Sequence, residues 1–470
     1  MRKRKSTAFF GIQLFPACFL AAICVLLITT CYLEGDLDAL WPTGSGTWGD
    51  PYIVHNVATL KKVGRGDDGW GLEEDTYYIQ TRNIDLSTVS NWKPIGTILD
   101  PFNGNYNGLG HTIKNLNINI SADNQGLFGV LGKKGNVEYV NLVNVNITGD
   151  DNTSTNTGSV AGLSYGTVTN CSSTGSVIGY DYVGGLVGQV CADNDDTSVV
   201  EKCYSTCNVT GTNYCAGGVA GYVTRGSNIT YCYSTGKIEG SSNIGGVVGR
   251  VDVDSGDGII EYCYSTGKVT GAYYIGGVVG VNNKGKVSNC YSTSNVTGDE
   301  SVGGVTGLNQ NGGNIIYCYS TGSVENRNDT STGGVVGMNT AGDDTSSVEY
   351  CVALGPSVTN GGGTYIGRVA GYNLGTLHNN YARSNMTVTG LGTISPEDSV
   401  LNYGTENTHG ANVNDDSHDN DVEGGYFNED FWTGVMGWEF GNNGIWEIRS
   451  GGLPILQGFP GVTQTPEILN

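Results

Sequence analysis

The phrase CYSTGKIEGSSNIGGVVG occupies residues 232–249, and close copies of it follow at residues 263–280 and 290–307. These copies read CYSTGKVTGAYYIGGVVG and CYSTSNVTGDESVGGVTG. The cysteine that opens the phrase recurs at Cys171, Cys203, Cys232, Cys263, Cys290, Cys318 and Cys351, in steps of 32, 29, 31, 27, 28 and 33 residues. A repeat of near 30 residues therefore organises the middle of the chain.

Each copy holds two or three short β-branched runs separated by glycine. Such runs are too short to close a core alone, but they form one when successive copies stack. Looser copies at residues 126–149 and 365–390 extend the array to about nine copies. We therefore expect an all-β fold, a right-handed parallel β-solenoid of about nine turns over residues 121–390.

The flanking regions differ from the repeat and suggest caps. Residues 41–120 are rich in strand-forming runs, and residues 391–423 are polar and acidic. Residues 424–460 are again rich in aromatic and apolar side chains. We expect a β-rich N-terminal capping region, an acidic linker and a C-terminal cap in these three ranges.

Composition and charge exclude several classes of partner. The chain has 470 residues, 76 of them glycine and only 10 proline, which fits a β-rich chain with many tight turns. Its formal net charge is −22, so nucleic-acid backbones would be repelled. Neutral glycans, proteins or cations are the more natural partners.

The first 33 residues have the layout of an export segment. Arg2, Lys3, Arg4 and Lys5 precede a largely apolar run from Ala8 to Leu33. The run is long enough to span a bilayer, so a cleaved signal peptide and an uncleaved signal anchor both remain open. Lipidation at Cys31 is a third alternative. All three readings place the protein outside the cell or on its surface.

The repeat resembles the repeats of a known protein family. The Gly-Gly-Val-Val-Gly and Cys-Tyr-Ser-Thr-Gly phrases are similar to the GLUG-motif repeats of bacterial and archaeal surface proteins. The strand-rich region before the repeats and the segment GWEFGNNGIWEIRSGGLPIL at residues 437–456 resemble the usual flanks of such repeats. The resemblance implies the architecture and a surface or adhesin-like role, whereas its motifs do not specify an activity.

Stacking turns each repeated residue into a column. The cysteine column is predicted to point inward as small packed thiols, with disulfides between stacked neighbours as the main alternative. Cys191, Cys207 and Cys215 lie outside the column and are the better disulfide candidates. Zinc is the least favoured reading, since the chain has no CxxC motif and only five scattered histidines.

A tyrosine follows the cysteine in five copies. Strand alternation places this residue on the face opposite to the cysteine, towards solvent. We therefore expect an exposed aromatic strip that binds a glycan or a protein partner. The candidate binding residues are Tyr204, Tyr233, Tyr264, Tyr291 and Tyr319.

Acidic insertions occur at one point of the turn, at residues 191–198, 252–258 and 341–347. Asp252, Asp254 and Asp257 approach a calcium loop, but the spacing is off by one and a bidentate glutamate is missing. We expect at most weak Ca²⁺ binding there, no other cofactor and no resident metal.

Three classes of function remain in view. The favoured one is a non-enzymatic exported rod, adhesin-like, that attaches to glycan or protein surfaces or assembles with copies of itself. A polysaccharide-active β-helix enzyme is the main alternative, and it would need non-repeating acids with an arginine or lysine in a groove. A purely structural spacer or fibre component is the third. No catalytic residue is assigned.

Overall fold

The computed structural model describes most of the chain after residue 43. The described residues are 44–66, 69–149, 153–192, 197–253, 258–328, 330–342, 344–362, 365–390, 411–413, 425–441, 444–449, 452–459 and 462–466. The export segment and most of the acidic linker lie outside them. Residues from Gly44 onward group into one compact unit.

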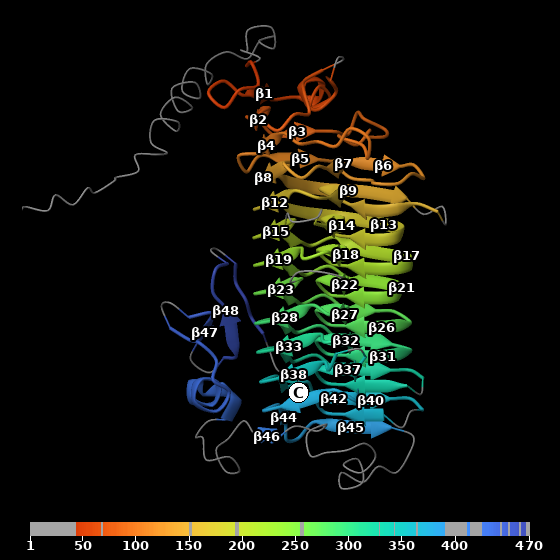
Figure 1. Cartoon of the computed structure of the whole chain (residues 1–470), viewed down its shortest axis with the longest axis vertical. Coiled ribbons are helices and arrows are strands. Elements are labelled where there is room, and N and C mark those ends of the chain that lie inside the picture. The colour runs from red at the N-terminus through yellow and green to blue at the C-terminus, as the bar shows by residue number, and fades with distance from the viewer. Residues whose placement is uncertain are drawn as a thin grey trace, which may run out of the picture. The chain divides into compact units, whose positions relative to one another are not determined.

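The fold is a parallel β-solenoid of about 11 turns, so the expected fold class is confirmed (Figure 1). Each repeat turn adds one strand to the first sheet, one to the second and one to three to the third. One sheet has 12 strands in the described residues. In order along the stack they are β1 (Tyr52–Val54), β2 (Tyr77–Gln80), β4 (Asn105–Asn107), β8 (Asn136–Glu138), β12 (Thr167–Thr169), β15 (Val199–Glu201), β19 (Asn228–Thr230), β23 (Ile259–Glu261), β28 (Lys286–Ser288), β33 (Asn314–Ile316), β38 (Ser347–Glu349) and β43 (Thr376–His378).

A second sheet has nine described strands, all paired in parallel. They are β7 (Phe128–Leu131), β11 (Ala161–Ser164), β14 (Val187–Cys191), β18 (Ala220–Thr224), β22 (Val248–Asp252), β27 (Val279–Asn283), β32 (Thr306–Gln310), β37 (Val336–Asn339) and β42 (Ala370–Asn373).

The remaining solenoid strands form a third, larger sheet. They are β3 (Ile84–Asp85), β5 (Thr112–Lys114), β6 (Asn117–Asn119), β9 (Asn141–Gly149), β10 (Thr155–Gly158), β13 (Ser172–Gly184), β16 (Tyr204–Ser205), β17 (Asn208–Gly217), β20 (Tyr233–Ser234), β21 (Ile238–Gly245), β24 (Tyr264–Ser265), β25 (Val269–Thr270), β26 (Tyr273–Gly276), β29 (Tyr291–Ser292), β30 (Val296–Gly298), β31 (Glu300–Gly303), β34 (Tyr319–Ser320), β35 (Val324–Asn326), β36 (Ser331–Gly333), β39 (Val352–Ala353), β40 (Ser357–Asn360), β41 (Tyr365–Gly367), β44 (Tyr381–Arg383), β45 (Thr387–Gly390) and β46 (Ala411–Val413).

The Gly-Gly pair of the repeat marks a turn where neighbouring coils approach closely. A Cβ atom on Gly246 would lie 2.0 Å from the carbonyl oxygen of Gly277, and one on Gly277 would lie 2.0 Å from that of Gly304. Real Cβ contacts are never that short, so only glycine fits this position. The repeated Gly-Gly phrase is thus a steric requirement of stacking.

The core consists of the inward side chains of all three sheets. In the first sheet the central residue of each strand is a buried valine or isoleucine over many turns, such as Val200, Ile229, Ile260 and Val287. Burial of each such side chain contributes about 1.5–3 kcal/mol. The repetition of one inward position therefore builds a continuous core along the stack.

One inward column of the second sheet is polar. Asn282, Asn309, Asn339 and Asn373 occupy the same register on β27, β32, β37 and β42. Each Nδ2 donates to the Oδ1 of the next asparagine, at 2.8, 2.9 and 2.7 Å. Each of these three amides also donates to a backbone carbonyl, so the ladder links buried polar groups of successive turns and favours one register between them.

The cysteine column points inward, as expected. All ten described cysteines are buried and free, so the disulfides expected around Cys191, Cys207 and Cys215 are not formed in this structure. Burial raises the pKa of the column thiols Cys171 and Cys203 well above the usual value. These thiols act as small packed side chains.

The expected N-terminal cap is continuous with the stack. Strands β1, β2 and β4 pair in parallel with each other and then with β8, in the same sheet as the repeats. The short helix α2 (Val57–Leu60) lies between β1 and β2. Residues 52–119 therefore form further turns of the solenoid, with larger aromatic side chains such as Phe102 and Tyr106 in the core.

The C-terminal segment, residues 425–466, joins none of the solenoid sheets in its described part. It contains η3 (Gly425–Phe427), the π-helical turn η4 (Phe431–Val435) and an antiparallel pair, β47 (Trp446–Ile448) with β48 (Pro454–Leu456). In Figure 1 it lies along one side of the stack. Among the described residues no helix is long and apolar enough to cross a membrane.

Candidate functional site

The five candidate tyrosines form one continuous column, called here the tyrosine ladder. Tyr204, Tyr233, Tyr264, Tyr291 and Tyr319 pair in register on adjacent strands. Their ring centroids are 4.9, 4.8, 4.8 and 5.1 Å apart along the column, and neighbouring rings lie within 7° of parallel. The structure therefore brings all five together.

The ladder points away from the cysteine column, but it is not exposed. Tyr233, Tyr264, Tyr291 and Tyr319 retain 9, 3, 1 and 0% of their exposed area, and only Tyr204 is half-buried. The expectation of an aromatic strip open to solvent is therefore wrong. The physical reason is that the C-terminal segment packs against these rings.

The contact between the C-terminal segment and the ladder is largely aromatic. The Phe459 ring lies edge-on to Tyr233 and Tyr264, with centroids 5.8 and 5.3 Å apart. Trp446 lies 6.4 Å from Tyr291 and 5.9 Å from Tyr319. These rings fill the outer face of the ladder over four turns.

Hydrogen bonds fix the position of the segment along the ladder. The Tyr291 hydroxyl donates to Oε1 of Gln464 at 3.0 Å, and the Tyr319 hydroxyl donates to the Pro454 carbonyl at 2.6 Å. The indole N–H of Trp446 donates to Oδ1 of Asn289 at 3.3 Å. Because these bonds involve buried groups, they select one register for docking.

A second set of tyrosines supports the same contact. Tyr231, Tyr262, Tyr317 and Tyr350 adopt left-handed backbone conformations at the corner that precedes the cysteine. Tyr231 stacks on Tyr262 with centroids 4.6 Å apart, and the Trp438 indole N–H donates to the Tyr350 carbonyl.

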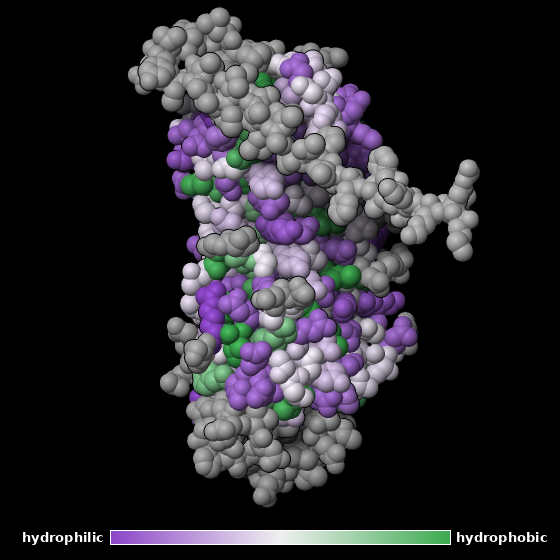
Figure 2. Space-filling view, turned by 90° about the vertical axis from the view of Figure 1, so that its left-hand side faces the viewer, coloured by the Kyte–Doolittle hydropathy of each residue, from purple (hydrophilic) through white to green (hydrophobic). Residues whose placement is uncertain are grey.

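Figure 2 views the side of the molecule that carries the C-terminal segment. Hydrophobic residues show there as small patches among hydrophilic ones, without one continuous apolar strip. The side that the sequence assigned to ligand binding is thus occupied by the chain itself.

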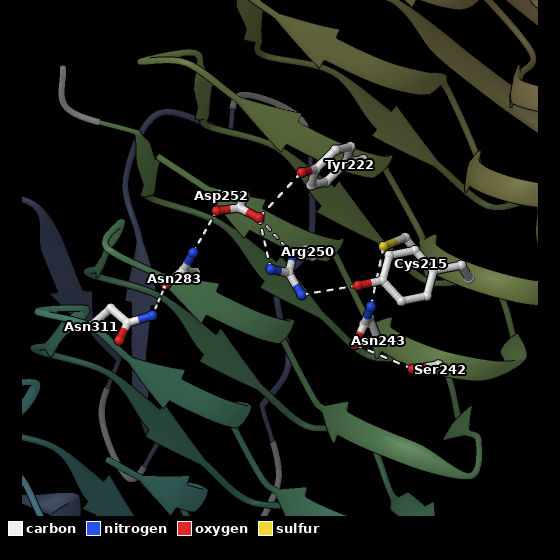
Figure 3. A network of polar contacts seen from close by, with 9 residues as sticks. Cys215, Tyr222, Ser242, Asn243, Arg250, Asp252, Asn283 and Asn311 are labelled. Carbon is white, nitrogen blue, oxygen red and sulfur yellow. Dashed lines mark hydrogen bonds and ion pairs between the residues drawn. The ribbon is translucent and has the colours of Figure 1, made fainter. Parts of the chain in front are cut away.

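A different group of partly exposed side chains comes from the second sheet and from the adjoining β13 and β17, and Figure 3 shows its polar contacts. We call it the Arg250 cluster: Tyr182, Tyr214, Tyr222, Arg250, Asp252, Asn283 and Asn311. Arg250 donates to Oδ2 of Asp252 from Nη2 at 2.7 Å and from Nε at 3.1 Å. Its Nη1 donates to the Tyr214 hydroxyl at 3.0 Å.

Asp252 is the centre of this network. Its Oδ2 also accepts from the Tyr222 hydroxyl at 3.2 Å, and its Oδ1 accepts from the amide of Asn283. Asn283 in turn accepts from Nδ2 of Asn311 at 2.7 Å. The network therefore runs from one turn to the next along the stack.

Aromatic rings flank the polar atoms. Tyr182 stacks on Tyr222 with centroids 4.7 Å apart and 17° between the planes, and it meets Tyr214 edge-on at 6.2 Å. The backbone of Tyr182 is left-handed, with φ of 52°. This corner conformation places its ring over the neighbouring sheet.

The charges of the cluster are partly shielded from water. The side chains of Arg250 and Asp252 are each 19% exposed. Burial lowers the pKa of Arg250, but the hydrogen bond and charge of Asp252 outweigh it, so the pKa is raised overall. Burial and the Asp252 charge together raise the pKa of Tyr222. At neutral pH the cluster therefore presents a paired cation and carboxylate beside neutral phenols.

The cluster could not be predicted from the repeated residues, because its members do not recur from turn to turn. The Arg250 position is filled in successive turns by different side chains, some of them buried and some partly exposed. They are Leu163, Gln189, Tyr222, Arg250, Val281 and Leu308. When the copies are aligned by the Gly-Gly phrase, Arg250 is the charged residue among these six side chains. This difference in charge is the sequence feature that could have indicated the cluster.

The acidic insertions are only partly described. Asp252 is committed to Arg250, Tyr222 and Asn283, whereas Asp254 and Asp257 lie outside the described residues. Within the described part of the chain, no three His, Cys, Asp or Glu side chains gather as metal ligands. Weak Ca²⁺ binding at these aspartates stays a prediction.

A shallow polar depression of about 360 Å³ lies on another face. Its lining residues are Thr266, Lys268, Thr293, Asn295, Thr297, Ser323 and Glu325. They come from equivalent positions of adjacent turns, as β25, β30 and β35 pair in register there. Unlike the Arg250 cluster, the depression contains little that distinguishes one turn from the next.

The stacked turns and repeated outward columns define a solenoid repeat protein. The repeats themselves are of a known kind, because residues 212–239, 240–270, 271–297 and 298–325 match the family model "The GLUG motif" as four consecutive copies. The chain thus carries GLUG-motif repeats, and the resemblance seen in the sequence is confirmed for this part.

Two relatives are similar over a third of the chain. Halomucin of Haloquadratum walsbyi is 31% identical over 156 residues, which is 33% of this chain and 2% of halomucin. A provisionally named Gly-rich membrane protein of Evansella cellulosilytica is 31% identical over 168 residues, 33% of this chain and 18% of that protein. The chain therefore spans only a small part of the length of either relative.

A solved structure, a provisionally assigned immunoglobulin A1 protease from Bacteroides ovatus, aligns with a TM-score of 0.41 and 19% identity. The alignment covers 89% of this chain and 95% of the other. At this level of similarity we draw no conclusion from it.

Proposed function

We propose that the protein is a non-enzymatic, exported surface protein whose solenoid attaches, in the manner of an adhesin, to a glycan or protein surface or to further copies of itself. The GLUG-motif repeats and the matches to a halomucin and a membrane protein support a place at the cell surface. The export-type segment at residues 1–33 agrees with this location.

The observation that carries the proposal is the repetition of outward positions. Away from the tyrosine ladder, strands β25, β30 and β35 also pair in register, so a partly exposed position such as Thr270 is followed by Thr297 about 4.8 Å further along the stack. Contacts that are weak singly gain strength when several act on one extended partner. An array of this kind suits attachment to a polymer or a surface.

The test is a binding assay with the intact exported protein. We expect saturable attachment to cells or to immobilised cell-surface polysaccharide, without any breakdown of the polysaccharide. If the protein binds no cells, no glycans, no proteins and no copies of itself, the attachment proposal is overturned. The remaining alternative is then a spacer or fibre role.

One observation favours the enzymatic alternative as a second candidate. Asp252, Arg250 and the hydroxyls of Tyr214 and Tyr222 bring a non-repeating carboxylate, a cation and two phenols together, which is part of what a polysaccharide-cleaving β-helix needs. Turnover of a polysaccharide that stops in an Asp252→Asn variant would establish this alternative. We expect no turnover.

A further inference from the structure

Arg250 is a charged residue in a column whose neighbouring turns carry uncharged side chains. The next two turns place Val281 and Leu308 at the Arg250 register, and both are buried. A half-buried arginine costs more desolvation than a valine in the same place. Positions that break a local rule without stabilising the fold are expected at functional sites.

We propose that the Arg250 cluster is a binding site for a neutral glycan chain. The tyrosine rings stack on the apolar faces of the sugar rings, and the sugar hydroxyls exchange hydrogen bonds with Asp252, Asn283 and Asn311. This inference rests on the proposed attachment function, and it names the partner class and the place where that partner binds.

The cluster offers both kinds of group that bind a sugar, namely aromatic rings and hydrogen-bonding polar groups. Tyr182, Tyr214 and Tyr222 present rings whose apolar bodies and polar edges suit a pyranose. Oδ1 of Asp252, which accepts one hydrogen bond within the cluster while Oδ2 accepts three, and the two asparagine amides offer acceptors and donors already held in place by their mutual hydrogen bonds. Preorganised polar groups lose less entropy on binding than free ones.

Charge favours neutral over acidic glycans. The positive charge of Arg250 is already matched by Asp252, and Asp181 lies one residue before Tyr182. The chain as a whole carries a net charge of −22. This negative charge would repel a carboxylated or sulfated polymer, and Arg250, which is already paired with Asp252, is not free to bind its anionic groups.

The shape of the cluster points to a chain of sugars rather than a single one. Asp252 and Asn283 pair in register on adjacent strands, and Asn311 follows Gln310, the register partner of Asn283. The polar row thus crosses three turns that lie about 4.8 Å apart. Figure 3 shows Asp252, Asn283 and Asn311 in this row, and a linear oligosaccharide laid along the stack would reach all three turns.

The repeat itself supplies variants that remove the site and keep the fold. Tyr182→Asn introduces the residue found at the same left-handed corner at Asn156 and Asn243. Arg250→Val introduces the residue of the next turn, Val281. The matched control is Arg327→Ala, because Arg327 also pairs with an aspartate, Asp299 at 2.6 Å, away from the tyrosine cluster.

The experiment is titration calorimetry of the full chain with cellohexaose, mannohexaose and maltohexaose, with hexagalacturonate as the acidic counterpart. We expect at least one neutral hexasaccharide to bind. Loss of one ring contact or of the arginine is expected to weaken this binding by about tenfold in each variant. Arg327→Ala should bind as the unmodified protein does, and circular dichroism shows that each variant is folded.

Three results would overturn the inference: tighter binding of hexagalacturonate than of every neutral probe, no binding of any neutral probe, or unchanged binding in folded Tyr182→Asn and Arg250→Val. A parallel cell-attachment assay separates this failure from that of the proposed function. Attachment that persists in both variants contradicts the site alone, whereas absence of attachment by the unmodified protein contradicts the function.

Discussion

The protein has two tyrosine-bearing faces, and they serve different ends. The tyrosine ladder is regular, apolar in its surroundings and covered by the C-terminal segment. The rings of the Arg250 cluster are irregular, mixed with charged and amide groups, and remain partly open. In this protein the regular aromatic column thus packs within the chain, whereas the irregular Arg250 cluster is the candidate site for another molecule.

The comparison also explains why exposure could not be read from strand alternation. Alternation gives the direction of a side chain relative to its own sheet. It gives no information on whether another segment covers that face. A repeated aromatic column is an apolar surface, and the chain contains its own partner for it.

The largest expected effect is on docking of the C-terminal segment. Trp446 is fully buried between Tyr291, Tyr319 and Trp438. Trp446→Ala should destabilise the docked segment by about 3–5 kcal/mol, because it removes this ring and leaves a cavity. Limited proteolysis should then cleave the segment much faster while the solenoid stays intact.

Trp48→Ala is the matched control, since Trp48 is 65% exposed. It should change stability by less than about 0.5 kcal/mol. Equal protease resistance of the segment in Trp446→Ala and in the unmodified protein would contradict the docking contact described here.

The second-largest expected effect is the release of the C-terminal segment at alkaline pH. Burial and, secondarily, the neighbouring Tyr204 raise the pKa of Tyr233 to about 12, and burial also raises the pKa of Tyr264, Tyr291 and Tyr319. An unfolded tyrosine has a pKa of about 10. The stabilisation is therefore complete below pH of about 10 and is lost as the pH rises through the folded-state values.

Tryptophan fluorescence and tyrosinate absorbance should show a joint transition above pH of about 11. The Trp446→Ala protein, already undocked, should show tyrosinate absorbance at lower pH and no fluorescence step. Identical titrations of the two proteins would show that the ladder is not protected by the segment.

A smaller effect separates the hydrogen bonds of the ladder from its rings. Tyr291→Phe removes the bond to Gln464 and keeps the ring, so docking should weaken by about 1 kcal/mol. The half-buried Tyr204 has no partner in the C-terminal segment among the described contacts, and Tyr204→Phe should have no measurable effect. Chemical denaturation monitored by tryptophan fluorescence gives both values, and equal losses would contradict the assigned contact.

The sequence predicted the parts of the fold that the repeat encodes. The Gly-Gly phrase, the inward cysteines and the inward valines recur through the central turns, so their common environment follows from stacking. The cover over the ladder could not be predicted in this way, because Trp446 and Phe459 occur once and reach their partners across more than 100 residues of chain. The one sequence feature that indicates this contact is the aromatic-rich C-terminal segment, which is too short to bury its aromatic side chains in a core of its own.

The candidate site was predicted less well than the fold for a related reason. A search for repeated residues finds columns such as Tyr264 and Tyr291, which the structure uses for packing. Arg250 and Tyr222 are informative because they are not repeated, and their proximity to Tyr182 and Tyr214 depends on the corner geometry of two sheets. Neither the corner nor its left-handed residues can be located from composition.

The smallest expected effect concerns the stability of the open face. In Arg250→Val, Asp252 keeps its bonds from Tyr222 and Asn283, and both charged side chains were already partly in water. Partly exposed ion pairs contribute about 0–1 kcal/mol, so the unfolding free energy should fall by less than about 1 kcal/mol. This is well below the loss in Trp446→Ala. Equilibrium denaturation in guanidinium, at low and high salt, measures it. A loss of about 3 kcal/mol or more would mean that the Arg250 cluster is a structural network like the asparagine ladder, and the contrast between a packed face and an open face would fail.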